Sequence, residues 1–259
     1  MYQFFLNSNT LFLSLTLFLF LFQGQARADS IQIAVASNFS ATMKALVKQF
    51  ETISSNEIKL SFGSTGKHYA QIHHGAPFDL FFAADSKRPE LLESSGLGIK
   101  GSRFTYAYGR LALWSSDVHK IDNQGLVLQQ ANFQHLALAN PKLAPYGSAA
   151  MDVLQHLTIK QKILPKLVYG ENISQVYQFI VSENVALGFI AYSQLTQASN
   201  GQKGSYWLVP ESMHRPIEQQ AIQLKQNKVA DNFLQFVKSN EGQKIIRQFG
   251  YSLENTNTK

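Results

Sequence analysis

Residues 63–85 read GSTGKHYAQIHHGAPFDLFFAAD and predict one unit of a parallel β-sheet. The apolar residues Ile58–Phe62 before them are expected to form a strand, and the Gly-Ser-Thr-Gly sequence is typical of a turn. Lys67–His74 predicts a short helix that Gly75 would end, and Phe78–Ala83 predicts the next strand. Two strands joined through a helix form a βαβ unit, in which the strands pair in parallel.

The same alternation of apolar strands and amphipathic helices extends along the rest of the chain. One expected helix carries Met43, Leu46, Val47 and Phe50 at a spacing that places them on one face. The other expected strands are Ile31–Ala36, Leu136–Ala139, Lys166–Tyr169, Leu187–Tyr192, Ser205–Val209 and Ala221–Leu224, and two helical stretches close the chain. The sequence therefore predicts an α/β fold of two lobes, with extended crossover segments as the hinge.

The composition is that of a globular protein without a nucleic-acid surface. Of the 259 residues, 45% are hydrophobic and 15% are charged, which leaves ample apolar material for two cores. The net charge is +6, but the basic residues are scattered, so nucleic acid is not an expected partner. The chain has no cysteine, which excludes disulfides, thiolate metal sites and a cysteine nucleophile.

The N-terminus has the pattern of an export signal. Leu11–Phe22 is an apolar run of 12 residues, shorter than the roughly 20 needed to span a bilayer. Ala26-Arg27-Ala28 supplies the small residues that a signal peptidase requires, so we expect residues 1–28 to be a signal peptide. No Lys or Arg precedes the apolar run, and an uncleaved membrane anchor is the alternative.

At four places an expected strand is followed by an expected helix, and residues with hydroxyl or amide side chains occur at each of these junctions. These positions are Ser37-Asn38, Ser64-Thr65, Tyr146-Gly147-Ser148 and Asn172-Ile173-Ser174. The first turn of a helix has backbone N–H groups without helical partners, and the helix dipole adds partial positive charge there. Several such helix starts around one crevice would bind a small anion without an ionic side chain. Each of them alone is typical of an ordinary helix cap.

Three histidines, His68, His73 and His74, raise the question of a metal site. Positions 68 and 73 lie roughly 140° apart around a helix, so the histidines cannot share one face. We expect them to be solvated.

Two carboxylates and a serine are the other candidates for chemistry. Asp79 and Asp85 are separated by a strand, which is too far for a catalytic pair, so a structural role is expected. Ser37 lacks the G-x-S-x-G sequence of a hydrolase nucleophile. No catalytic residue is therefore assigned, and we expect a protein that is not an enzyme.

Four segments together resemble one family over essentially the whole chain after residue 28. They are AVASNFSATMKALVKQFE (34–51), GSTGKHYAQIHHGAPFDLFFAAD (63–85), ALANPKLAPYGSAAMDVL (137–154) and GENISQVYQFIVSENVALGFIA (170–191). This pattern is similar to that of the periplasmic molybdate-binding proteins of ABC transporters. The resemblance implies a class II periplasmic binding protein, with a mixed sheet flanked by helices in each lobe and a tetrahedral oxyanion bound in the cleft between them.

The resemblance also implies which residues hold the anion. The set comprises the hydroxyl and backbone N–H of one serine with the asparagine beside it, one hydroxyl of the GSTG turn, and two backbone N–H groups. Its members are Ser37, Asn38, Ser64 or Thr65, Tyr146 and Ile173. Some relatives add a tyrosine hydroxyl, but that position here is Ala191, with Tyr192 one residue later, where a strand side chain would point the other way. Asn38 could replace that tyrosine.

The function implied is delivery of molybdate or tungstate to a membrane permease with an ATPase. Lobe 1 would comprise residues 30–107 and 209–259, and lobe 2 residues 108–208. The resemblance implies a periplasmic monomer with no cofactor and no direct protein ligand to molybdenum. The alternatives are a receptor for another tetrahedral oxyanion such as sulfate, an oxyanion sensor, and a hydrolase that uses Ser37.

The signal peptide gives the first prediction. Cleavage after Ala28 would leave a mature protein that begins at Asp29, because the apolar run is too short to remain as an anchor. Mass spectrometry of the exported protein measures this directly. An exported form that retains Met1 would show that the segment is not removed.

Overall fold

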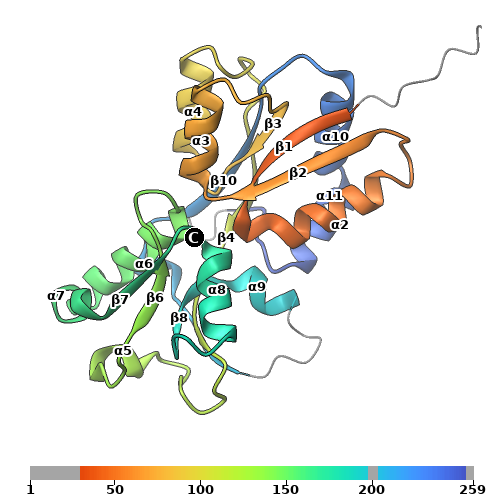
Figure 1. The fold of residues 1–259 in the computed structure, drawn as a ribbon. Coiled ribbons are helices and arrows are strands. Elements are labelled where there is room, and N and C mark those ends of the chain that lie inside the picture. The colour runs from red at the N-terminus through yellow and green to blue at the C-terminus, as the bar shows by residue number, and fades with distance from the viewer. Residues whose placement is uncertain (1–29, 198–203, 255–259) are drawn as a thin grey trace, which may run out of the picture.

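The computed structural model describes residues 30–197 and 204–254 and forms two lobes, each built on a five-stranded sheet (Figure 1). We call the upper lobe of the figure lobe 1 and the lower one lobe 2. The expected signal peptide lies outside the described residues.

The two sheets share one plan. Across lobe 1 the strands are, in order, β2 (Glu57–Gly63), β1 (Ser30–Ala36), β3 (Leu80–Phe82), β10 (Ile217–Gln223) and β4 (Phe104–Gly109). Across lobe 2 they are β7 (Leu167–Gly170), β6 (Leu136–Ala139), β8 (Gly188–Ala191), β5 (Leu111–Ser115) and β9 (Ser205–Leu208). In each sheet the first three strands are parallel, and the fourth is antiparallel to both of its neighbours. The predicted two-lobed α/β fold with mixed sheets is therefore confirmed.

The described chain passes from one lobe to the other at two places. Arg110 joins β4 to β5, and residues 209–216, which include the short helix η3 (Glu211–Met213), join β9 to β10. Each crossing leads from the fifth strand of one sheet to the fourth strand of the other. The lobe boundary expected between residues 107 and 108 falls inside β4.

Alternating side chains of β1 divide the core of lobe 1 into two layers. Ile31, Ile33 and Val35 belong to one apolar cluster and Ala34 to the other, as the two-residue period of a strand requires. The first layer is closed by α2 (Ser40–Phe50), α10 (Lys228–Lys238) and α11 (Asn240–Gln248). The second is closed by α3 (Thr65–His73) and α4 (Lys87–Ser94), on the other side of the sheet (Figure 1).

Lobe 2 has one continuous apolar cluster around its sheet. The helices α6 (Pro145–His156) and α8 (Ile173–Val181) each bury an apolar face, with Val153, Leu154, Val176 and Ile180 fully inaccessible. The remaining helical segments are α5 (Leu126–Gln130), α7 (Lys160–Ile163), η2 (Leu164–Lys166) and α9 (Tyr192–Gln197). Over residues 30–197 and 204–254, no helix is long and apolar enough to span a membrane.

Several element boundaries differ from the sequence-based expectation. Strand β10 begins at Ile217, four residues before the expected Ala221, and α3 begins at Thr65 instead of Lys67. In the first turn of α4, which begins at Lys87, the Asp85 carboxylate accepts the backbone N–H of Arg88 at 3.0 Å. The strand expected over Phe78–Ala83 pairs only over Leu80–Phe82.

Phe233 tests how much lobe 1 depends on its C-terminal helices. The side chain is fully buried, and its ring centroid lies 5.3 Å from that of Phe50 and 6.3 Å from that of Phe82. Phe233→Ala should lower the free energy of unfolding by about 3–5 kcal/mol, because it leaves a cavity in the apolar layer. Urea unfolding followed by circular dichroism measures this. Ile53→Ala, at a side chain that is 70% exposed, is the control and should change it by under about 0.5 kcal/mol.

Candidate functional site

A small cavity of about 10 Å³ lies between the two lobes. Its walls come from all four of the strand-to-helix junctions that the sequence singled out. The lining residues are Ala36, Ser37, Asn38, Gly63, Ser64, Thr65, Ala84, Ala144, Pro145, Tyr146 and Ile173. The structure thus brings all six predicted site residues together around one space.

The start of α3 presents two hydroxyl groups at this cavity. Ser64 Oγ accepts the backbone N–H of Lys67 at 3.4 Å and caps the helix, while Thr65 Oγ1 accepts the backbone N–H of Ala84 at 3.0 Å. In both cases the hydroxyl acts as an acceptor toward the protein, so its proton remains available for a ligand. Ser64 and Thr65 are equally suited by this criterion.

The start of α6 leaves one amide for a ligand. The carbonyl of Ala144 accepts the N–H groups of Gly147 and Ser148 at 3.0 and 3.2 Å. Pro145 occupies the first helical position and has no N–H. Among the described residues, no hydrogen bond uses the N–H of Tyr146, which is the next amide in the chain.

The start of α8 has the same property through a side-chain cap. Asn172 Oδ1 accepts the N–H groups of Ser174 and Gln175 at 3.0 and 3.1 Å. The first amide of the helix, that of Ile173, is not used by any described residue, and Ile173 lines the cavity. Two helices of lobe 2 therefore direct unpaired N–H groups toward the cavity.

Ser37 and Asn38 provide the wall from lobe 1. Both are buried, and the hydroxyl of Ser37 bonds no other residue in the described part of the chain. Asn38 differs from expectation, because its side-chain Nδ2 donates to Gln219 Oε1 at 2.8 Å and to Tyr251 Oη at 3.1 Å. These bonds occupy both amide protons of the side chain. Asn38 can therefore offer a ligand its backbone N–H but not its side-chain donors.

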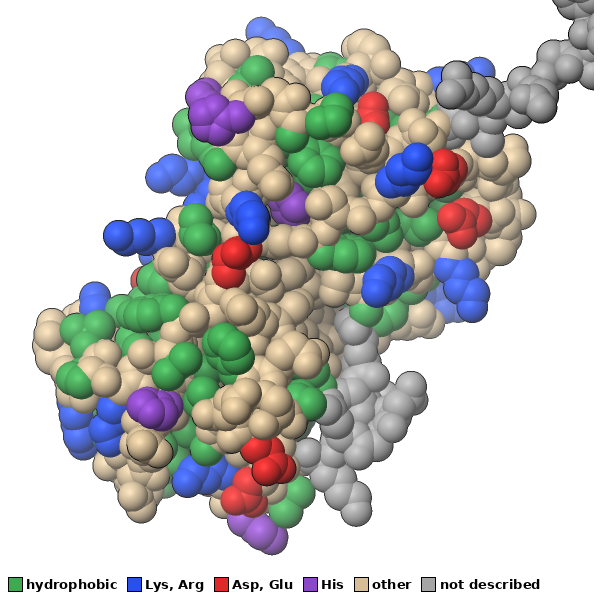
Figure 2. Space-filling view, viewed as in Figure 1, with side chains coloured by type: hydrophobic (Ala, Val, Ile, Leu, Met, Phe, Trp, Pro, Cys, Tyr) green, Lys and Arg blue, Asp and Glu red, His purple; other side chains and the backbone are tan. Residues whose placement is uncertain are grey.

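The cavity is electrically positive without any cationic side chain. None of its lining residues is charged, and three helix starts contribute the partial positive charge of their dipoles. Figure 2 shows Lys and Arg side chains spread over both lobes rather than gathered at one place on this face. Neutral donors that converge on one space in this way are suited to bind a small anion.

Comparison with known proteins identifies the family of this chain. The model of a family described as bacterial extracellular solute-binding proteins matches residues 31–252. The chain belongs to this family. It is 44% identical to the molybdate-binding protein ModA of Azotobacter vinelandii, over 86% of this chain and 90% of the relative. The ModA of Rhodobacter capsulatus is 41% identical, over 85% of this chain and 87% of the relative.

A solved structure of the Azotobacter vinelandii periplasmic molybdate-binding protein has the same fold. It superimposes with a TM-score of 0.82 at 38% identity, covering 87% of this solute-binding protein and all of the solved chain.

Tyr192 lies outside the cavity of this solute-binding protein. Ala191 ends β8 and Tyr192 begins α9, where its ring lies 6.1 Å from that of Tyr206 and beneath the guanidinium of Arg110. Neither Ala191 nor Tyr192 is among the residues that line the cavity.

Behind the cavity, a buried hydrogen-bond network connects the lobes, and sequence reasoning missed it. Gln219 of β10 is fully buried; its Oε1 accepts from Asn38 and, at 3.0 Å, from the hydroxyl of Tyr106. Its Nε2 donates to the hydroxyl of Tyr146 in lobe 2 at 3.2 Å. Burial raises the pKa of Tyr106, Tyr146 and Tyr251, so the network is neutral at physiological pH.

His68 is buried, and the expectation that all three histidines are solvated is wrong for it. His73 and His74 are exposed, but only 2% of His68 is accessible. Its Nδ1 lies 3.1 Å from Gln71 Oε1, and its buried Nε2 has no partner. A Cβ built on Gly63, which lines the cavity, would lie 3.0 Å from Nε2, so the ring packs directly behind the cavity wall. The sequence does contain an indication that His68 is buried. His68 precedes the buried Ile72 by four residues, so the two side chains lie on the same face of the helix.

The remaining candidates for chemistry have structural partners. Asp79 accepts the backbone N–H of Gln32 at 2.7 Å, and Asp85 pairs with Arg88. Within the described parts of the chain, no group of three His, Asp or Glu side chains is placed to hold a metal ion.

His68 should make the stability of the protein depend on pH. Burial lowers its pKa below the ordinary value of about 6.5, so below that pH the unfolded chain binds a proton that the folded protein does not. The free energy of unfolding should therefore fall as the pH decreases from 7.5 to 5.5, and His68→Gln should reduce this slope. Urea unfolding at several pH values measures it, with the exposed His73→Gln as control. Equal slopes for the parent and His68→Gln would contradict the prediction.

Proposed function

We propose that this protein binds molybdate or tungstate between its lobes and delivers the ion to a permease with an ATPase in the membrane. The observation that carries the proposal is the convergence of unpaired neutral donors from both lobes on one cavity with no charged lining. The two relatives named as molybdate-binding proteins, at 44% and 41% identity, support the choice of ion.

Each donor has a defined place in the proposed complex. Ser37 would donate its hydroxyl and backbone N–H, and Asn38 its backbone N–H, from lobe 1. Ser64 or Thr65 would add a hydroxyl at the start of α3, and lobe 2 would supply the N–H groups of Tyr146 and Ile173. A fully deprotonated dianion can accept hydrogen bonds from all of these groups. Hydrogen phosphate carries a proton on one oxygen, and that proton would point at a donor instead of an acceptor.

Binding would involve movement of the lobes about the two crossings. The crossings, Arg110 and residues 209–216, lie close to the boundaries of the expected division into residues 30–107 with 209–259 and residues 108–208. The cavity is enclosed by residues of both lobes, so entry of the ion would require the lobes to separate. The ion would shift the equilibrium between open and closed forms only to the extent that it binds the closed form more tightly than the open form.

The proposed setting is the periplasm, reached through the signal peptide of residues 1–28. In this setting the protein acts as a monomer, without catalytic activity, cofactor or nucleic-acid partner. The solved relative is itself described as periplasmic.

Isothermal titration of the mature protein with molybdate, tungstate, sulfate and phosphate tests the proposed function. Binding of molybdate and tungstate, with weaker sulfate and no phosphate binding, is expected. Preferential binding of sulfate would change the assigned ion, and binding of none of the four would overturn the function.

Ser37→Ala tests the neutral-donor site. The substitution removes a hydrogen bond to a charged ligand, worth about 1.5–3 kcal/mol, which corresponds to roughly tenfold to 150-fold weaker molybdate binding. Ser40→Ala, one turn away and not lining the cavity, is the matched control and should keep the parent affinity. If Ser37→Ala binds molybdate as tightly as the parent, the hydroxyl is not a ligand.

A further inference from the structure

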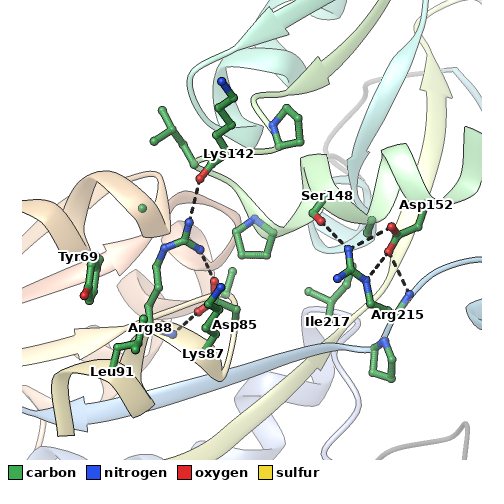
Figure 3. Close-up of a pocket in the computed structure, with 17 residues that line it drawn as sticks. Tyr69, Asp85, Lys87, Arg88, Leu91, Lys142, Ser148, Asp152, Arg215 and Ile217 are labelled. Atoms are coloured by element: carbon green, nitrogen blue, oxygen red, sulfur yellow. Dashed lines mark hydrogen bonds and ion pairs between the residues drawn. The ribbon is translucent and has the colours of Figure 1, made fainter. Parts of the chain in front are cut away.

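A second and much larger hollow lies between the lobes beside the cavity (Figure 3). This outer cleft has a volume of about 660 Å³. Its walls come from α3 and α4 of lobe 1, the loop of residues 140–144 and α6 of lobe 2, and the crossing at residues 215–217. Ala84 and Pro145 line both the outer cleft and the inner cavity, so the two spaces adjoin.

Two hydrogen bonds between the lobes lie where the spaces meet. The backbone N–H of Gly66 donates to the carbonyl of Leu143 at 2.8 Å, and the Arg88 guanidinium donates to the carbonyl of Lys142 at 2.9 Å. We call these four residues the seam. Its donors belong to α3 and α4 of lobe 1, and its acceptors are consecutive carbonyls of one loop in lobe 2.

The residues next to the seam in the chain are those that line the inner cavity. Thr65 precedes Gly66, and Leu143 is followed by Ala144, Pro145 and Tyr146. Contact at the seam is close, because a Cβ on Gly66 would lie 3.0 Å from Arg88 Nη2 and from the Leu143 carbonyl oxygen. The seam therefore lines the outer cleft directly beside residues of the inner cavity.

Arg88 is held in place for this contact by Asp85. The Asp85 carboxylate accepts from the Arg88 guanidinium and from its backbone N–H, and Figure 3 shows the same guanidinium reaching Lys142. Asp85 directly follows the cavity residue Ala84, so Arg88 also neutralises the carboxylate nearest in sequence to the proposed anion site.

Other cations of the outer cleft do not bridge the lobes in this way. Arg215 pairs with Asp152 and Ser148 of α6, on the opposite wall. Lys87 lies on α4 beside Arg88, is exposed, and forms no ion pair within the described residues.

We propose that the seam is the gate of the inner cavity and that Arg88 is the positioning residue that slows escape of the bound oxyanion. Arg88 does not touch the ion. Its bond to Lys142 fixes the loop that leads into Tyr146, and the loop must release both seam bonds before the ion can reach the outer cleft. The inference rests on the proposed function, because it concerns the retention of that ligand.

Dissociation of molybdate, measured by rapid mixing with excess competing tungstate, tests the gate. Arg88→Ala should release molybdate roughly tenfold faster, because it removes a hydrogen bond from a charged donor, while the association rate stays within about twofold. Lys87→Ala removes the same charge from the same helix and should release molybdate at the parent rate. Thermal unfolding checks that each variant is folded, and Arg88→Lys replaces Arg88→Ala if that variant is not. A lysine cannot hold Asp85 and Lys142 with one planar fork, so it too should accelerate release.

A double variant distinguishes the proposed gate from electrostatic repulsion between the Asp85 carboxylate and the bound anion. If release accelerates only because the Asp85 carboxylate is left uncompensated, Asp85→Asn combined with Arg88→Ala would return the rate to that of the parent and overturn the gate. Fast release in the double variant supports the gate. A parent rate in Arg88→Ala alone would also overturn it. In both overturning results the parent still binds molybdate, whereas a parent that binds no oxyanion overturns the proposed function itself.

Discussion

The site of this protein depends on one constraint. The first backbone N–H groups of a helix have no partner within the helix and need one elsewhere. Helices α6 and α8 each satisfy the amides of their first turn except one, those of Tyr146 and Ile173, and both of these lie at the same cavity. A buried N–H group without a partner costs about 1–3 kcal/mol, so the closed arrangement leaves the protein with donors that an anion would satisfy. The fold of lobe 2 places both amides at one cavity.

The sequence predicted helices, helix ends and candidate site residues where the contacts that determine them lie between residues close together in the chain. The spacing of apolar residues identified the helices, and Gly75, at a φ of +86°, follows the end of α3 as expected. The candidate site residues could be proposed because caps and helix starts lie within a few positions of one another in the chain. That these junctions would converge required the order of the strands, which local patterns do not contain, and here the family resemblance was decisive.

Contacts between distant segments could not be inferred in the same way. Asn38 bonds Gln219 and Tyr251, which are 181 and 213 positions away, so nothing near Asn38 indicates that its amide protons are occupied. The start of β10 was missed because Glu218, Gln219 and Gln220 are polar, although the two glutamines are buried and hydrogen-bonded. The hydroxyl of Tyr146 takes part in the same network, so truncating this side chain would disturb the wall behind the cavity as well as leave its amide in place.

The placement of β10 and Tyr251 also sets an order of assembly. Lobe 2 is one continuous stretch of chain, whereas lobe 1 inserts β10 between β3 and β4, and Tyr251 donates to the carbonyl of Asn38 at 2.8 Å. The lobe that begins the chain therefore cannot complete its sheet until the last fifth of the polypeptide is available. A chain that is threaded across a membrane from its N-terminus would emerge with lobe 1 still incomplete, and its central lobe could fold first.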